Sequence, residues 1–149
     1  MSFSDFTTDN ELLAKRLKEV DESVKSRPNE MDARLEGKYL GCCGEEKSLT
    51  IEFPVLDWEA NYSGILHGGI ICTMLDHTAG VTAICFMGGW TPTVDLDVHF
   101  LRKAEVGDTL LSKAKIEFCG RNIIHLSAEL TSKTTGKTVA TALATYLNS

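Results

Sequence analysis

A long, almost uncharged segment covers residues 60–94 and holds a single formally charged side chain, Asp76. Within it, residues 68–86 are apolar enough and long enough to cross a small domain as one buried helix, which two glycines at 88–89 end. A helix that is apolar on all sides has to be covered by other elements. The rest of the chain is therefore expected to provide that cover.

Alternation of apolar and polar residues predicts strands on both sides of this helix. Residues 37–43 and 47–56 are separated by Gly-Glu-Glu and are typical of a hairpin, with Pro54 near a strand end. In residues 94–100 the even-numbered positions are apolar and share one face, while Asp95, Asp97 and His99 share the other.

The same period of two recurs in three later segments, with typical turn sequences between them. One face of each strand is formed, in turn, by Ser112, Ala114, Ile116 and Phe118; by Ile124, Leu126, Ala128 and Leu130; and by Val139, Thr141, Leu143 and Thr145. Short strands with short loops form an antiparallel meander, whose inner face the apolar helix can cover. The sequence predicts an α+β domain in which a curved antiparallel sheet wraps one central helix.

An additional helix is expected before this domain. Thr8 and Glu11 have the spacing of a capping box, and apolar residues then recur at helical spacing until Pro28. We therefore divide the chain into an N-terminal helical extension, residues 1–30, and a single domain, residues 31–149. The polar face of the helix mixes acids and bases, which favours packing on the domain edge over membrane anchoring.

Charge and cysteine content narrow the function classes. The net charge of −6 disfavours non-specific binding to nucleic acid or to an anionic membrane, so phosphate binding would need a local basic cluster. The N-terminal residues have no apolar signal-peptide core, which indicates a cytoplasmic protein. None of the five cysteines forms a C-x-x-C pair, so we expect reduced structural thiols and no metal site.

Asp76 is the exception within the apolar segment. A charge in apolar surroundings is costly unless it is paired or hydrogen-bonded. Asp76 therefore either lies less deeply than the pattern suggests, or is tolerated because it performs a task. The structural alternative is a carboxylate bonded to a helix end or to a neighbouring hydroxyl such as that of Thr73.

A spaced motif precedes this aspartate: Asn61, Gly64, His67, Gly68 and Gly69 form N-x-x-G-x-x-H-G-G. Together with Asp76 and the segments 93–108 and 120–140, the motif resembles the hotdog-fold thioesterases, specifically the branch of phenylacetate-operon and small acyl-CoA thioesterases. The resemblance covers residues 37–147. It implies a hotdog fold and a working unit that is a dimer or a dimer of dimers. It also implies hydrolysis of an acyl-CoA thioester without a metal or bound cofactor.

The resemblance also implies roles for single residues. Asn61 and the backbone N–H of Gly68 would polarise the thioester carbonyl, and Asp76 would act on the attacking water or as the nucleophile. Thr93 would help to position the water. His67 is a candidate general base, or else a residue that bonds to the backbone and shapes the turn.

Coenzyme A carries phosphates, for which basic residues near turns are candidates: Arg102, Lys103, Arg121, Lys133 and Lys137. We prefer Arg102 and Arg121 because arginine suits bidentate phosphate binding. Gly69 has no Cβ and would let the substrate approach the backbone closely. The acyl pocket is expected to be lined by the apolar helix and the sheet.

The spacing of the motif has a further consequence. Eight residues separate Gly68 from Asp76, which is about 12 Å of helix rise, too far for one thioester carbon to reach both. The site is therefore expected to be shared by two chains. Two other functions stay open: a hotdog dehydratase or hydratase that uses His67 with Asp76, and a non-catalytic acyl-CoA-binding module.

Overall fold

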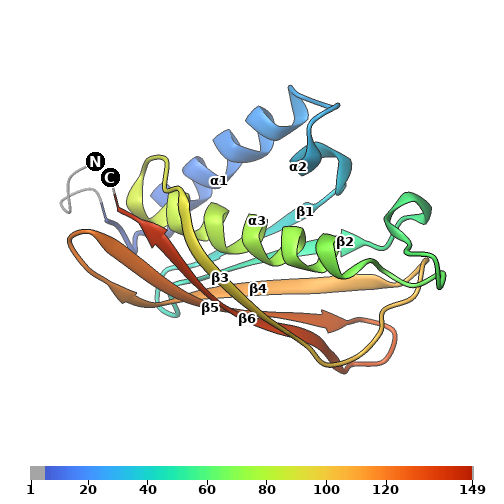
Figure 1. Ribbon diagram of the computed structural model, residues 1–149. Helices are drawn as coiled ribbons and strands as arrows, with labels where there is room; N and C mark the ends of the chain where they lie inside the picture. Colours follow the sequence, from blue (N-terminus) through green and yellow to red (C-terminus); the bar gives the residue numbers. More distant parts are fainter. Residues whose placement is uncertain (1–5, 149) are drawn as a thin grey trace.

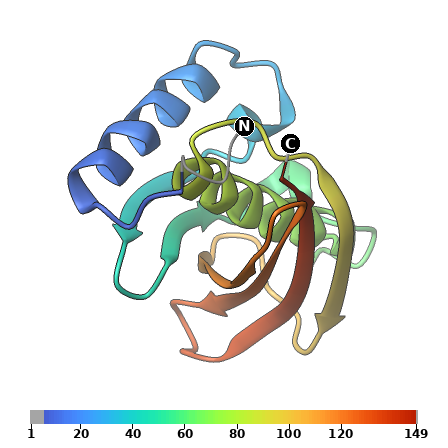
Figure 2. The ribbon, with the colours of Figure 1, turned by 90° about the vertical axis from the view of Figure 1, so that its left-hand side faces the viewer.

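The computed structural model describes residues 6–148, and in it a six-stranded antiparallel sheet curves around one long helix (Figures 1 and 2). In chain order the elements are α1 (Asn10–Lys25), α2 (Met31–Arg34), β1 (Lys38–Cys43), β2 (Ser48–Pro54), the 3-10 helix η2 (Asp57–Glu59), α3 (Gly68–Met87), β3 (Thr93–Phe100), β4 (Thr109–Cys119), β5 (Ile123–Ser132) and β6 (Thr138–Leu147). The strand order is β1-β2-β4-β5-β6-β3. The predicted α+β fold, with an additional N-terminal helix, is confirmed.

The central helix α3 packs its sheet-facing side tightly. Met74, Leu75, Ala79 and Phe86 are all fully buried in the main hydrophobic cluster. Thr78 is also buried, and its hydroxyl donates to the carbonyl oxygen of Met74 at 2.8 Å. The core therefore contains no unpaired polar group at this position. By length and composition α3 could also cross a membrane, but 61% of its apolar window is buried inside the protein, as in a core helix.

The N-terminal helix α1 begins one residue later than its sequence indicated. The Asp9 side chain accepts a hydrogen bond from the Leu12 N–H at 2.8 Å and is the N-cap, so the capping box expected at Thr8 is wrong. An aspartate fills this position as well as a threonine does. Leu13 and Leu17 of α1 are buried in the same cluster that contains α3.

The C-terminal end of α3 is closed by a glycine and by α1. Gly88 adopts a left-handed conformation with a φ of 82° and ends the helix where the sequence predicted. The Arg16 guanidinium of α1 donates to the carbonyl oxygen of Cys85 at 2.8 Å. A positive charge at a helix C-terminus complements the helix dipole, so this contact links α1 to α3.

The buried face of β6 is not the one that the alternation singled out. Ala140, Ala142, Ala144 and Tyr146 are buried, whereas Leu143 is 63% exposed. The buried face of β6 consists mainly of alanines, which allow close packing. Because the sequence pattern was judged by larger apolar residues such as Leu143, it selected the opposite face.

Irregularities in two other strands also displaced expected core residues. In β4 the register shifts between Ile116 and Phe118, which leaves Phe118 55% exposed. In β3, a shift near Val94 leaves that side chain 60% exposed, and Phe100 at the other end is 55% exposed. Among the described residues, β3 pairs only with β6, so its other edge is open.

A buried carboxyl group lies in the loop that leads to α3. Glu59 is 1% exposed, and its Oε2 accepts from the Leu56 N–H at 3.2 Å, while no described residue contacts its Oε1 through a hydrogen bond. The Glu59 carbonyl oxygen accepts from the His67 N–H at 2.9 Å. Burial, which disfavours the charged form, raises the pKa of Glu59 to about 7.

This carboxyl group makes a testable contribution to stability. Its pKa of about 7 in the folded state exceeds the ordinary value of 4.5, so folding binds the proton more tightly and stability falls as pH rises through this window. Glu59→Gln lacks the titrating group and should not lose this stability. The difference in free energy of unfolding, Glu59→Gln minus unmodified protein, should therefore increase by about 1–3 kcal/mol between about pH 5 and pH 8. Urea titrations at both pH values measure it, with Glu129→Gln as the exposed control. A difference independent of pH would contradict the assignment.

Candidate functional site

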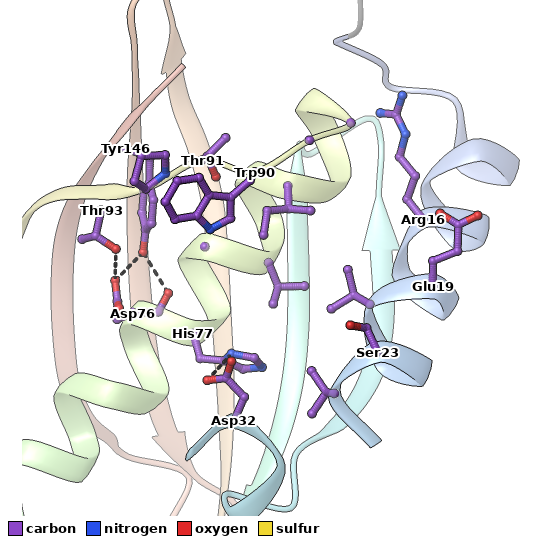
Figure 3. A pocket seen from close by; sticks show the side chains of 18 of the residues that line it. Arg16, Glu19, Ser23, Asp32, Asp76, His77, Trp90, Thr91, Thr93 and Tyr146 are labelled. Atoms are coloured by element: carbon purple, nitrogen blue, oxygen red, sulfur yellow. Dashed lines mark hydrogen bonds and ion pairs between the residues drawn. The ribbon is translucent and has the colours of Figure 1, made fainter. Parts of the chain in front are cut away.

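Asp76 lies on α3, where two hydroxyl groups hold its carboxylate (Figure 3). Oδ1 accepts from Thr93 Oγ1 at 2.9 Å and from Tyr146 Oη at 2.7 Å. No other described residue donates to Oδ2, which leaves its lone pairs available. The alternative partner, Thr73, instead donates to the Gly69 carbonyl oxygen at 2.9 Å. The structure thus brings Asp76 and Thr93 together and leaves one carboxylate oxygen facing solvent or a ligand.

Tyr146 is the member of this cluster that the sequence did not reveal. Its side chain is 1% exposed, and its hydroxyl also lies 2.8 Å from the Asp76 carbonyl oxygen. Burial and the neighbouring Asp76 charge raise the pKa of Tyr146 above its usual range, so the phenol stays neutral and can donate. The signal that could have identified it is the alanine-lined face of β6, which ends at this tyrosine.

A cleft of about 720 Å³ adjoins the Asp76 cluster and lies between α1, the outer side of α3 and the segment before β3 (Figure 3). The Asp76 cluster lines the side next to β3. The lining residues from α1 are Arg16, Glu19, Val20, Ser23, Val24 and Arg27. The N-terminal helix, to which sequence analysis gave no role in the site, is therefore one of its walls.

His77, the next residue on α3, connects three elements beside the cleft. Its side chain is 7% exposed, with Nδ1 3.2 Å from Asp32 Oδ1 and Nε2 2.7 Å from Tyr39 Oη. The hydrogen bond from His77 lowers the pKa of Asp32, against the opposing effect of burial. The two ring nitrogens thus face a carboxylate and a phenol on different elements. This chain of contacts fixes α2 and β1 against the helix that carries Asp76.

The glycines of the H-G-G motif form the start of α3, as expected, and His67 is the N-cap. Its Nδ1 accepts from the Gly69 N–H at 2.9 Å, which is the backbone role considered for this residue. The Gly69 N–H is therefore occupied within the chain. No described residue accepts from the Gly68 N–H, which stays available to an external oxygen.

Asn61 forms the turn that precedes this helix end. Its Oδ1 accepts from the Ser63 N–H at 2.9 Å and from the Ile65 N–H at 3.4 Å. The side-chain carbonyl is thus engaged in the turn, and this orients the amide Nδ2 away from it. Nδ2 is a donor with no hydrogen-bond partner among the described residues.

Three of the five candidate phosphate ligands, Arg102, Lys103 and Lys137, line one cleft, whereas Lys133 pairs with Glu52 and Arg121 lies elsewhere. Arg102 donates to the Thr138 carbonyl oxygen at 2.8 Å, and Lys103 pairs with Glu105 at 2.9 Å, near the strand end that carries Phe100. Arg121 is in the turn between β4 and β5, near the opposite end of β3. An eight-residue strand separates the two ends by roughly 23 Å.

Within one chain, the carboxylate and the backbone donor likewise lie apart. Phe100 lies beside Gly68, where an added Cβ would be 3.4 Å from its ring, whereas Asp76 contacts Thr93 at the other end of β3. One chain therefore presents a carboxylate at one end of β3 and, at the other, a backbone N–H that is unpaired among the described residues. Thioester hydrolysis requires both at one carbonyl group.

Comparison with known proteins agrees with this chemistry. The family model of the thioesterase superfamily matches residues 63–139. Acyl-coenzyme A thioesterase 13 of Mus musculus is 30% identical over 129 residues, which cover 86% of this chain and 91% of the mouse protein.

Two solved structures are similar as well. Zebrafish thioesterase superfamily member 2 has a TM-score of 0.79 at 22% identity, covers 89% of this chain and 98% of its own, and shows the shared fold. A Streptococcus mutans protein bound to acetyl CoA has a TM-score of 0.69 at 26% identity, with 74% of this chain and 86% of that chain covered. Because the family model spans more than half of the chain and the mouse relative matches most of it, the chain belongs to the thioesterase superfamily and is a hotdog-fold acyl-CoA thioesterase.

Proposed function

We propose that two chains together form each active site for acyl-CoA hydrolysis, with Asp76 of one chain facing Gly68 and Asn61 of the other. The observation that carries the proposal is the Asp76 carboxylate, whose Oδ1 is held by Thr93 and Tyr146 while Oδ2 has no partner among the described residues. Such a group is positioned to act on an external molecule rather than to stabilise the helix.

The open edge of β3 supports a two-chain arrangement. Val94, Phe100 and Leu101 are each more than half exposed there, and the strand has unpaired backbone groups on that side. If two copies pair antiparallel through β3, the Phe100 end of one strand lies beside the Thr93 end of the other. This symmetry brings the Gly68 N–H of one chain towards Asp76 of its partner, twice in each dimer.

The chemistry follows from these roles. Asp76 accepts a proton from a water molecule, and the resulting hydroxide attacks the thioester carbonyl carbon. The Gly68 N–H and the Asn61 amide stabilise the oxyanion, and collapse of the intermediate breaks the carbon–sulfur bond. The departing CoA thiolate takes up the proton held by Asp76, which restores the carboxylate. Direct attack by Asp76 is the other route. Label recovered in Asp76 after a single turnover in heavy-oxygen water would establish direct attack, because a water molecule activated by Asp76 places its oxygen only in the released acid.

The remaining residues fit supporting roles. Arg102 and Lys103 lie near the Gly68 end of β3, where the CoA phosphates would follow the thioester. No metal or bound cofactor takes part in the proposed steps. The dehydratase alternative needs His67 as a base, but its Nδ1 is occupied by the Gly69 N–H, which favours a capping role.

Replacement of Asp76 tests the catalytic carboxylate. Asp76→Asn keeps the side-chain shape and should lower kcat by about 10²–10⁴-fold with little change in melting temperature, because the amide cannot accept the proton. Release of free CoA thiol from a panel of acyl-CoAs measures the rate. Glu129→Gln, on the exposed face of β5, is the control. Full activity in Asp76→Asn would rule out the assignment.

Tyr146 is proposed to position the carboxylate. Tyr146→Phe should lower kcat by roughly tenfold while KM changes little, because the Thr93 hydrogen bond to Oδ1 remains. Tyr39→Phe is a matched control, since it removes another largely buried hydroxyl that contacts His77 instead of Asp76. Equal effects of both variants on kcat would show that only general stability is involved.

Mixed dimers test the shared site directly. Gly68→Pro removes the N–H donor at the first helical position, where proline is tolerated, and His67 before it has a ψ of 134° that suits a residue preceding proline. Gly68→Ala adds a Cβ but keeps the N–H, and serves as the control. A purified dimer of one Gly68→Pro chain and one Asp76→Asn chain contains one intact site and should have about half of the unmodified activity. Inactive mixed dimers would contradict a shared site.

A further inference from the structure

The cleft between α1 and α3 has features of a binding pocket. The proposed reaction assigns no part of the substrate to it. It begins at Asp76 and follows one stripe of α3 through Gly80, Val81 and Ile84. Val20 and Val24 of α1 add apolar side chains to the lining, which also includes the charged Glu19, Arg27 and Asp32. Figure 3 shows the side chains of α1 and α3 facing each other across the open space.

The sheet-facing side of α3 is tightly packed. Met74, Leu75 and Ala79 are fully buried there. The cleft on the outer side of α3 also contacts the sheet, because Thr93 of β3 and Tyr146 of β6 line it. The outer side differs because α1 diverges from α3 towards its own C-terminal end, as Figure 1 shows, and Leu17 is the last buried residue of α1.

Gly80 widens the cleft next to the carboxylate. It lies one turn after Asp76, and a Cβ added there would be 3.5 Å from the Tyr146 ring, an ordinary contact distance. The glycine is thus not required by close packing. Its effect is to leave room along the helix immediately beyond the position of the thioester carbon.

From these observations we infer that the α1–α3 cleft binds the acyl group of the substrate, and that it takes a straight, uncharged apolar chain of about ten carbons. The inference rests on the proposed function. Ile84 lies about 12 Å of helix rise beyond Asp76, and an extended chain advances about 1.2 Å per bond, which gives that length. Trp90 and Arg16 line the cleft as well, and the Arg16 guanidinium already bonds to the Cys85 carbonyl oxygen.

The far end of the cleft provides the test. Ile84→Trp on α3 and Val20→Trp on α1 should each lower the ratio of kcat/KM for decanoyl-CoA to that for acetyl-CoA by roughly tenfold or more, because they shorten the space for the chain. Ile84→Ala lengthens the space for the chain and should raise the ratio of kcat/KM for dodecanoyl-CoA to that for decanoyl-CoA. Leu12→Trp, on the part of α1 that does not line the cleft, is the control and should leave both ratios unchanged.

The outcomes separate the two proposals. Unchanged ratios in folded Ile84→Trp and Val20→Trp would overturn the acyl pocket while leaving acyl-CoA hydrolysis intact. Absence of turnover with every acyl-CoA in the unmodified protein would overturn the proposed function and the pocket with it. If Ile84→Trp instead altered the oligomeric state, as measured by light scattering, with unchanged ratios, the cleft would be covered by a second copy and the inference would be wrong.

Discussion

The need to cover a long apolar helix determines the arrangement of this protein. The curved sheet buries one side of α3 completely, and α1 covers part of the other side. Cover is incomplete where α1 diverges, so a strip of α3 remains open. Asp76 lies on that strip, which explains how a carboxylate is tolerated in an otherwise apolar helix. Its charge does not enter the core, and two hydroxyls supply hydrogen bonds.

The same helix separates the chemical groups of the site. Within a helix, backbone N–H groups are unpaired only at its start, so the oxyanion donor that we propose lies near Gly68. Hydroxyl partners for a carboxylate come from β3 and β6, which place Asp76 two turns further along. A rigid helix cannot bring these positions together. Oligomerisation through the open edge of β3 is the physical solution that we propose.

Much of this architecture could be predicted from residue patterns, and the failures have identifiable causes. Helix α3, its end at Gly88, and the alternating strands followed from hydrophobic periodicity. The buried face of β6 was missed because alanines pack where larger side chains were expected. Tyr146 was missed with it, and a register shift in β4 moved Phe118 outward. The contact of His77 with Asp32 and Tyr39 joins three distant segments, which no local pattern reveals.

The sequence by itself determined the elements, the helix N-terminus at the H-G-G motif and the distance between Gly68 and Asp76, because these depend on local backbone geometry and on spacing along the chain. Only the tertiary structure decided which hydroxyls hold Asp76, that His67 caps α3 through Gly69, and that α1 forms one wall of the cleft. Those features depend on the curvature of the sheet and the divergence of two helices, which arise from packing between segments far apart in the chain.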